Sequence, residues 1–137
     1  MRTLKLLLVD DHPGFINAAM RHLRRLDWIQ VLGMAGNGIE AITQCEVLRP
    51  DVVLMDLAMP EMGGLQATRL IKAQDNPPFV VIASHFDDAE HREHAIRAGA
   101  DAFVSKLAYI HDVMPVLERL AGEGASAGRL ADEGTPA

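Results

Sequence analysis

Four short apolar segments, each followed by a polar or charged side chain, limit the folds open to this chain more than any other feature. The segments cover residues 4–9, 51–55, 79–83 and 102–105. Near-continuous runs rich in valine, leucine and isoleucine are typical of strands in a parallel sheet that helices cover on both faces. Between them, apolar residues recur at helical spacing. The sequence therefore predicts that strands and helices alternate along the chain.

A fifth strand and five helices complete the predicted pattern. We expect the extra strand at residues 29–35, and one helix must stop before Pro50, because the residue that precedes a proline disfavours helix. The helices are expected to cover approximately residues 16–26, 39–48, 65–73, 87–99 and 112–120. Pro115 would then lie in the first turn of the last helix, where a missing N–H group is tolerated. The predicted fold is α/β, with five βα units in three layers around a parallel five-stranded sheet.

Length and composition indicate one domain. The 137 residues are enough for a hydrophobic core, and we assign residues 1–121 to the domain and residues 122–137, rich in glycine and alanine, to a flexible tail or linker. The formal net charge of −6 argues against nucleic-acid binding by this chain alone. No apolar stretch approaches the roughly 20 residues of a membrane span, and the N-terminus lacks the features of a secretory peptide. We therefore expect a cytoplasmic protein that does not bind membranes.

The polar residues that follow the strands form one candidate site. They are Asp10, Asp11, Asp56, Ser84 and Lys106. The carboxyl ends of parallel strands meet at one edge of the sheet, so these side chains are expected to converge. Two carboxylates at about 4 Å repel by roughly 1 to 4 kcal/mol, depending on the dielectric. That cost is offset if a hard divalent cation, usually Mg²⁺, lies among them beside a phosphoryl group.

The chemistry of the individual groups supports this interpretation. Asp56 is the candidate nucleophile, because it lies alone on the predicted central strand and carboxylates form acyl-phosphate intermediates. Ser84 can donate a hydrogen bond to a phosphoryl oxygen, and Lys106 can pair with it as a point charge. Each residue alone has a simpler explanation, as a helix cap, a turn residue or a solvated lysine. We interpret His12 as a loop residue beside the acidic pair. The joint pattern favours a site that is phosphorylated.

The motifs around these residues resemble the receiver domain of bacterial two-component response regulators. They lie at residues 8–13, 51–64, 83–84 and 99–106, and the resemblance covers residues 4 to about 121. The opening Asp11-His12-Pro13 is similar to the subclass with helix-turn-helix outputs. The resemblance implies a flavodoxin-like fold with strand order 2-1-3-4-5. It also implies phosphoryl transfer from a sensor histidine kinase, or from a small donor such as acetyl phosphate.

The resemblance also implies roles for the residues at the strand ends. Asp56 would accept the phosphoryl group. Asp11, Asp56 and the backbone carbonyl of Ala58 would ligate Mg²⁺, and Asp10 would assist through a water molecule. Ser84 and Lys106 would contact the phosphoryl group. The family members are signalling switches that phosphorylate themselves and lose the group slowly, so we do not expect a turnover enzyme.

The signal is expected to leave the site through an aromatic residue. Phe103 matches the aromatic side chain that swings inward when Ser84 is recruited to the phosphoryl group. The resemblance then implies phosphorylation-dependent homodimerisation or partner binding through the surface near Phe103, Ile110 and Val113. The output is expected to be transcriptional, and DNA would be bound only through an output domain that this chain does not contain.

Three positions depart from the family pattern and leave alternatives open. Leu107 stands where the family usually has a proline after a cis peptide, His85 replaces a small residue, and Ala58 cannot orient an attacking water. One alternative is a pseudo-receiver that only mediates protein contacts. The other is a phosphohydrolase of the haloacid dehalogenase type. That enzyme carries its nucleophile on the first strand, with an acid/base aspartate two residues later, where this chain has His12.

Overall fold

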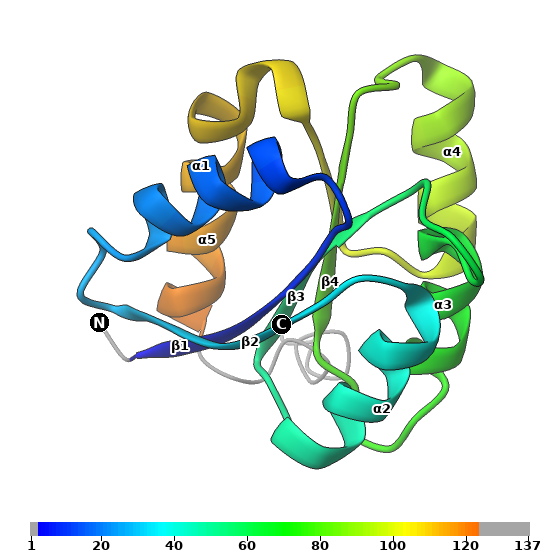
Figure 1. The fold of residues 1–137 in the computed structure, drawn as a ribbon, viewed down its shortest axis with the longest axis horizontal. Helices are drawn as coiled ribbons and strands as arrows, with labels where there is room; N and C mark the ends of the chain where they lie inside the picture. Colours follow the sequence, from blue (N-terminus) through cyan, green and yellow to red (C-terminus); the bar gives the residue numbers. More distant parts are fainter. Residues whose placement is uncertain (1–2, 124–137) are drawn as a thin grey trace.

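The computed structural model describes residues 3–123, in which strands and helices alternate (Figure 1). The elements are β1 (Leu4–Val9), α1 (Pro13–Leu23), β2 (Ile29–Ala35), α2 (Gly38–Leu48), β3 (Val52–Asp56), α3 (Gly64–Lys72), β4 (Phe79–Ser84), α4 (Ala89–Ala98), β5 (Ala102–Ser105), the short 3₁₀ helix η1 (Lys106–Ala108) and α5 (Tyr109–Glu123). No helix among these residues is long and apolar enough to cross a membrane.

The five strands form one parallel sheet in the order β2-β1-β3-β4-β5, as predicted. The register aligns the strand ends. Val9 pairs with Met55, and Asp56 pairs with Ala83. The residues at the ends of β1, β3 and β4 therefore lie level at one edge of the sheet. Strand order and register together gather the polar residues that the sequence places after each strand.

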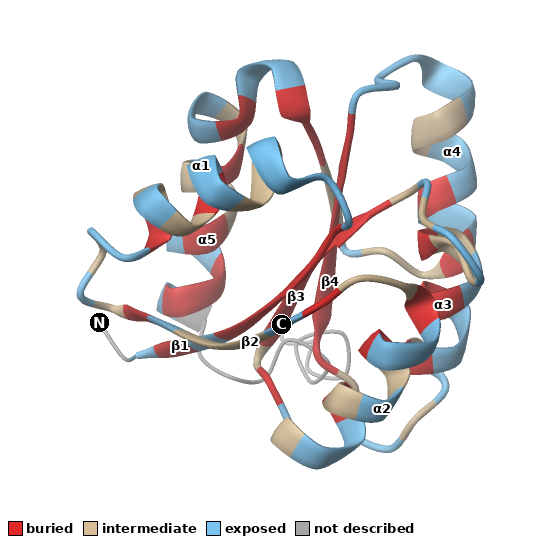
Figure 2. Ribbon diagram, in the orientation of Figure 1, coloured by how far each residue is buried: buried red, intermediate tan, exposed pale blue. Residues whose placement is uncertain are grey.

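Helices cover both faces of the sheet, so the central strands are buried along their whole length (Figure 2). Successive strand residues point to opposite faces. Leu6 and Leu54 pack with α1 and α5, whereas Leu7 and Val53 pack with α2, α3 and α4. Because each face has its own hydrophobic cluster, both sets of strand side chains must be apolar. This is why the strands appear in the sequence as continuous apolar runs.

The C-terminal region differs from its prediction. Helix α5 begins at Tyr109, three residues earlier than expected, because η1 leads directly into it. Tyr109 is buried and packs edge-on against Phe15 and His22, with ring centroids 5.1 and 5.5 Å apart, which anchors the start of the helix in the core. Pro115 consequently lies inside α5, and its predicted place in the first turn is wrong.

The burial of Val113 corrects the predicted interaction surface. Val113 is fully buried in the cluster under α1 and α5, so it cannot contribute to a docking surface. Ile110, one turn earlier, is exposed. Helix α5 also continues to Glu123, two residues into the segment that composition assigns to the tail. The rest of the predicted tail, residues 124–137, lies outside the described residues.

Candidate functional site

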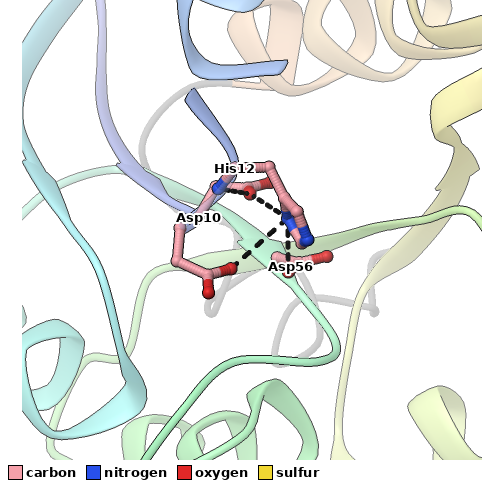
Figure 3. A group of neighbouring side chains, drawn as sticks. Asp10, His12 and Asp56 are labelled. Carbon is pink, nitrogen blue, oxygen red and sulfur yellow. Dashed lines mark hydrogen bonds and ion pairs between the residues drawn. The ribbon is translucent and has the colours of Figure 1, made fainter. Parts of the chain in front are cut away.

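The buried residues Asp10 and Asp56 lie beside His12 at the carboxyl edge of the sheet (Figure 3), and the exposed Asp11 follows Asp10 in the chain. Asp56 is the last residue of β3 and is 4% exposed, and Asp10, directly after β1, is 2% exposed. A third of the Asp11 side chain is exposed. The carboxyl end of the sheet thus carries the predicted acidic cluster, because the two central strands end side by side.

Lys106 closes the cluster from the other side. Its Nζ lies 2.7 Å from Asp10 Oδ2 and 3.0 Å from Asp56 Oδ1, and its side chain is completely buried. The ammonium also lies 4.5 Å from the centre of the Phe15 ring, a cation–π contact that the sequence did not suggest. Ser105 Oγ accepts the N–H of Leu107 at 3.2 Å. This bond fixes the turn that aims the lysine at the carboxylates.

Burial and like charge act on Asp56 together. Burial raises the pKa of the Asp56 carboxyl, and the neighbouring Asp10 raises it further, while Lys106 and His12 oppose the shift. Asp56 Oδ2 is buried and has no hydrogen-bond partner among the described residues. An ionised oxygen in that position is costly unless a cation or a bound group satisfies it. The geometry therefore leaves one buried carboxylate oxygen of Asp56 without a hydrogen bond among the described residues.

His12 contributes more to the cluster than its sequence interpretation suggested. Its Nδ1 lies 2.9 Å from Asp10 Oδ1, 3.3 Å from Asp11 Oδ1 and 3.5 Å from Asp56 Oδ2. Figure 3 shows the ring above Asp56, on the loop that follows β1. His12 is still a loop residue beside the acidic pair, but its ring also contacts the third carboxylate. The available signal was its position directly after Asp10 and Asp11.

The donor set fits a divalent cation. One ligand atom from each of Asp10, Asp11, His12 and Asp56 lies within 4.8 Å of the others. Carboxylate oxygens are the ligands that Mg²⁺ prefers, and the unpartnered Asp56 Oδ2 supplies one of them on the inner side. Ala58 lies two residues after Asp56 in the exposed loop that leads to α3.

A glycine makes the loop after Asp56 possible. A Cβ atom on Gly64 would lie 2.1 Å from the backbone oxygen of Asp56, so only glycine allows this close approach. The N–H of Gly64 donates to the carbonyl of Leu57 at 2.8 Å. The start of α3 is thereby drawn against the end of β3. This explains the second glycine of the pair in the sequence motif.

Ser84 ends the neighbouring strand. It is fully buried, and its Oγ accepts the N–H of Phe86 at 2.9 Å. The hydroxyl keeps its own proton for a second hydrogen bond. Phe86 itself is exposed and stacks on His91 with ring centroids 5.0 Å apart. Ser84 and Phe86 thus set the shape of the loop beside Asp56.

Phe103 in β5 is half-buried, and an arginine side chain lies over its ring. The guanidinium carbon of Arg92, on α4, lies 4.8 Å from the ring centroid. Arg92 Nε also donates to the carbonyl of Asp87 at 3.2 Å, in the loop that follows Ser84. One arginine therefore joins the loop beside the site to the predicted switch residue. Sequence analysis missed Arg92, because its contacts form only when α4 packs beside β5.

Comparison with known proteins agrees with this arrangement. The family model of the response regulator receiver domain matches residues 6–118. The uncharacterized transcriptional regulatory protein YhcZ of Bacillus subtilis (strain 168) is 36% identical over 103 residues, which cover 75% of this chain and 48% of YhcZ. Response regulator GacA of Pseudomonas syringae pv. syringae (strain B728a) is 33% identical, with 83% of this chain and 53% of GacA covered.

A solved structure extends the likeness to three dimensions. The crystal structure of a LuxR-family two-component response regulator from Aurantimonas sp. SI85-9A1 superimposes with a TM-score of 0.81 at 30% identity, covering 96% of this chain and 97% of that one. The chain spans about half the length of the two curated relatives described above. Both comparisons place the matched region over the sheet and its carboxyl edge.

Proposed function

The chain belongs to the response regulator receiver domain family, and we propose that it is a phosphorylation-driven switch whose acceptor is Asp56. The observation that carries the proposal is the asymmetric environment of this carboxylate. Oδ1 lies 3.0 Å from the buried ammonium of Lys106, while Oδ2 has no hydrogen-bond partner among the described residues. One oxygen is thus paired with the ammonium, and the other, which lies 3.5 Å from His12 Nδ1, is open to a cation or a phosphoryl group.

The proposed donor is the phosphohistidine of a sensor histidine kinase, or a small donor such as acetyl phosphate. A carboxylate oxygen of Asp56 forms the new O–P bond as the donor's N–P or O–P bond breaks, and the leaving group keeps the electron pair. Lys106 then pairs with the added negative charge, and the Ser84 hydroxyl can donate to a phosphoryl oxygen. Bound Mg²⁺ would neutralise the carboxylates and the phosphoryl oxygens. Asp11, Asp56 and the Ala58 carbonyl would hold it, with Asp10 assisting through water.

The switch is proposed to act through the loop that follows Ser84. Movement of Ser84 towards the phosphoryl group would shift the Oγ atom that accepts the Phe86 N–H, and would shift the loop with it. The same loop holds Arg92 through the carbonyl of Asp87, so its movement would release the cation above Phe103. A two-state loop of this kind is biased by any group that contacts one state more strongly.

The proposed output is association with a copy of this chain or with a partner. Leu107 and Ile110 are exposed apolar side chains close to the site, and they replace the buried Val113 in the predicted surface. Sedimentation with and without beryllofluoride tests this step, and identical masses with unchanged partner affinity would contradict it. By analogy with the relatives, the regulated process is proposed to be transcription in the cytoplasm, with DNA bound only by a separate output domain.

The acceptor assignment is tested by mass spectrometry of the intact chain after incubation with acetyl phosphate. We expect wild type to gain one phosphoryl group in the presence of Mg²⁺ and little in the presence of a chelator. Asp56→Asn should gain none, because it removes the nucleophile and keeps the volume. Asp75→Asn is the matched control, since Asp75 is exposed and far from the site in the turn before β4. Equal gain in Asp56→Asn and wild type would overturn the proposal.

A further inference from the structure

We propose that His12 is a nitrogen ligand of the divalent cation in the Asp56 pocket and shifts its selectivity from Mg²⁺ towards cations that prefer imidazole, such as Zn²⁺ and Co²⁺. The proposal rests on the cation site of the proposed function and adds which class of divalent cation that site prefers. Oxygen ligands suit Mg²⁺, whereas imidazole nitrogen suits zinc and the later transition metals. A single ring in contact with all three carboxylates changes the chemistry of the pocket.

The distances match those between ligands that share one cation. Two donors bonded at about 2.1 Å to one ion lie about 3.0 to 3.4 Å apart, in octahedral or tetrahedral shells respectively. His12 Nδ1 lies 2.9, 3.3 and 3.5 Å from one oxygen each of Asp10, Asp11 and Asp56. The nitrogen therefore lies at ligand spacing from one oxygen of each carboxylate. It can coordinate with little movement of the loop.

The hydrogen bonds around the ring permit coordination. In the absence of a cation, Nδ1–H can donate to Asp10 Oδ1 at 2.9 Å. A neutral imidazole carries one proton on either nitrogen, so that proton can move to Nε2 when Nδ1 binds a metal. The side chain of His12 is 52% exposed, which gives the displaced proton access to water. Asp10 Oδ1 keeps the backbone N–H of His12 at 2.9 Å as a second donor.

The burial of one Asp56 oxygen favours a cation in the pocket. Asp56 Oδ2 is buried, has no hydrogen-bond partner among the described residues, and faces His12 Nδ1 at 3.5 Å. Lys106 Nζ is paired with Asp10 Oδ2 at 2.7 Å and with the other Asp56 oxygen, Oδ1, at 3.0 Å. A cation between Asp56 Oδ2 and His12 Nδ1 would satisfy both atoms.

The test is calorimetric titration of Mg²⁺ and Zn²⁺ into the full chain as wild type, His12→Ala and His12→Gln. Both variants should weaken Zn²⁺ binding by at least about tenfold, as losing a metal-site partner commonly does, and should change Mg²⁺ binding far less. His94→Ala is the matched control, because His94 is exposed on α4 away from the pocket and reports adventitious Zn²⁺ binding. Pulsed electron paramagnetic resonance of Mn²⁺ should show a nitrogen coupling that only the His12 variants lose.

Three results would overturn the proposal. If the His12 variants bind both Mg²⁺ and Zn²⁺ more tightly than wild type, by the same factor, the imidazole ring blocks the site and the cation must displace it. If neither affinity changes, or if His85→Ala removes the nitrogen coupling instead, His12 is not the ligand. Phosphorylation by acetyl phosphate and Mg²⁺ in the same preparations separates the two proposals. Normal phosphorylation with unchanged selectivity defeats this inference alone, whereas no cation binding and no phosphorylation in wild type defeats the proposed function.

Discussion

Two lysine–aspartate contacts lie at opposite edges of the sheet and have different charge balances. At the amino edge, Lys72 Nζ lies 2.8 Å from Asp101 Oδ2 and donates to the Pro78 carbonyl at 2.9 Å. Asp101 Oδ2 also accepts the N–H of Val80 at 2.8 Å. One ammonium meets one carboxylate, and the groups are hydrogen-bonded. This contact ties α3, β4 and the start of β5 together.

At the carboxyl edge, one ammonium meets an excess of carboxylates. Lys106 contacts Asp10 and Asp56, Asp11 lies beside them, and one oxygen of Asp56 has no hydrogen-bond partner among the described residues. The same residue types therefore serve different purposes. A balanced pair stabilises the fold, whereas an unbalanced buried cluster is a site that gains stability only when it binds something.

The comparison predicts that Mg²⁺ stabilises only through the carboxyl edge. We expect millimolar Mg²⁺ to raise the free energy of unfolding by RT ln(1 + [Mg²⁺]/Kd), about 2.7 kcal/mol at 100 times the Kd. Thermal unfolding with and without Mg²⁺ measures this. Asp11→Asn should lose most of the gain, while Asp75→Asn, which removes an exposed carboxylate elsewhere, should keep it. A melting temperature indifferent to Mg²⁺ in wild type would count heavily against the acidic pocket.

Removing the carboxylate at the amino edge should destabilise the fold. Asp101→Ala leaves Lys72 Nζ without its carboxylate and the Val80 N–H without its side-chain acceptor. The expected loss is about 2 kcal/mol of unfolding free energy, because bonds to charged groups are among the stronger ones. Urea denaturation measures it, with Asp75→Ala as the exposed control. Unchanged stability would mean that this contact does not tie the strands together.

The matching change at the carboxyl edge should have the opposite sign when no cation is added. Asp56→Asn removes an ionised group whose pKa is raised by burial and by Asp10, so the folded state no longer bears its cost. We expect a gain of about 1 kcal/mol in unfolding free energy at neutral pH, similar to one like-charge repulsion. Urea denaturation in a chelating buffer checks this. A loss of stability would show that the pairing of Asp56 with Lys106 outweighs its desolvation.

The lifetime of the phosphoryl group would sharpen the description of the carboxyl edge. Ala58 offers no polar side chain to position water, and His85 and Phe86 are exposed on the loop beside Asp56. We expect slow hydrolysis, with phosphate loss several-fold faster in Ala58→Asn because orientation of water is part of the catalysis. His85→Ala should also hydrolyse faster if the ring shields the site. Slower loss in that variant would mean instead that His85 activates water.

The smallest predicted effect concerns Asp112, which supports the Lys106 turn from α5. The Ser105 N–H donates to Asp112 Oδ2 at 3.1 Å, and this bond holds the pKa of Asp112 below its usual value. Because the pKa of Asp112 is lower in the folded state, its carboxylate stabilises the fold at pH values above the unfolded-state pKa of about 3.9. This stabilisation is lost as the pH falls through the folded-state pKa. Asp112→Asn should therefore cost about 0.5 kcal/mol near pH 7, and the difference should shrink below about pH 4. A difference that is constant down to pH 3 would contradict this.

The sequence alone determined the sheet and the location of the site. Apolar runs that end in charged residues predicted a parallel sheet whose strands are buried on both sides. The strand order was inferred from the family motifs and is confirmed. Asp10, Asp56 and Lys106 were placed together because they follow strands whose ends share an edge. These features are local in sequence, since burial fixes residue type and strand polarity fixes which end carries the polar group.

The tertiary structure decided what depends on contacts between distant segments. The start of α5 moved to Tyr109 because that ring packs between Phe15 and His22, which are far away in the sequence. The position of Arg92 above the Phe103 ring depends on how α4 docks beside β5. Sequence spacing does not encode these distances, because they arise from how whole elements pack, and packing is a property of the folded chain.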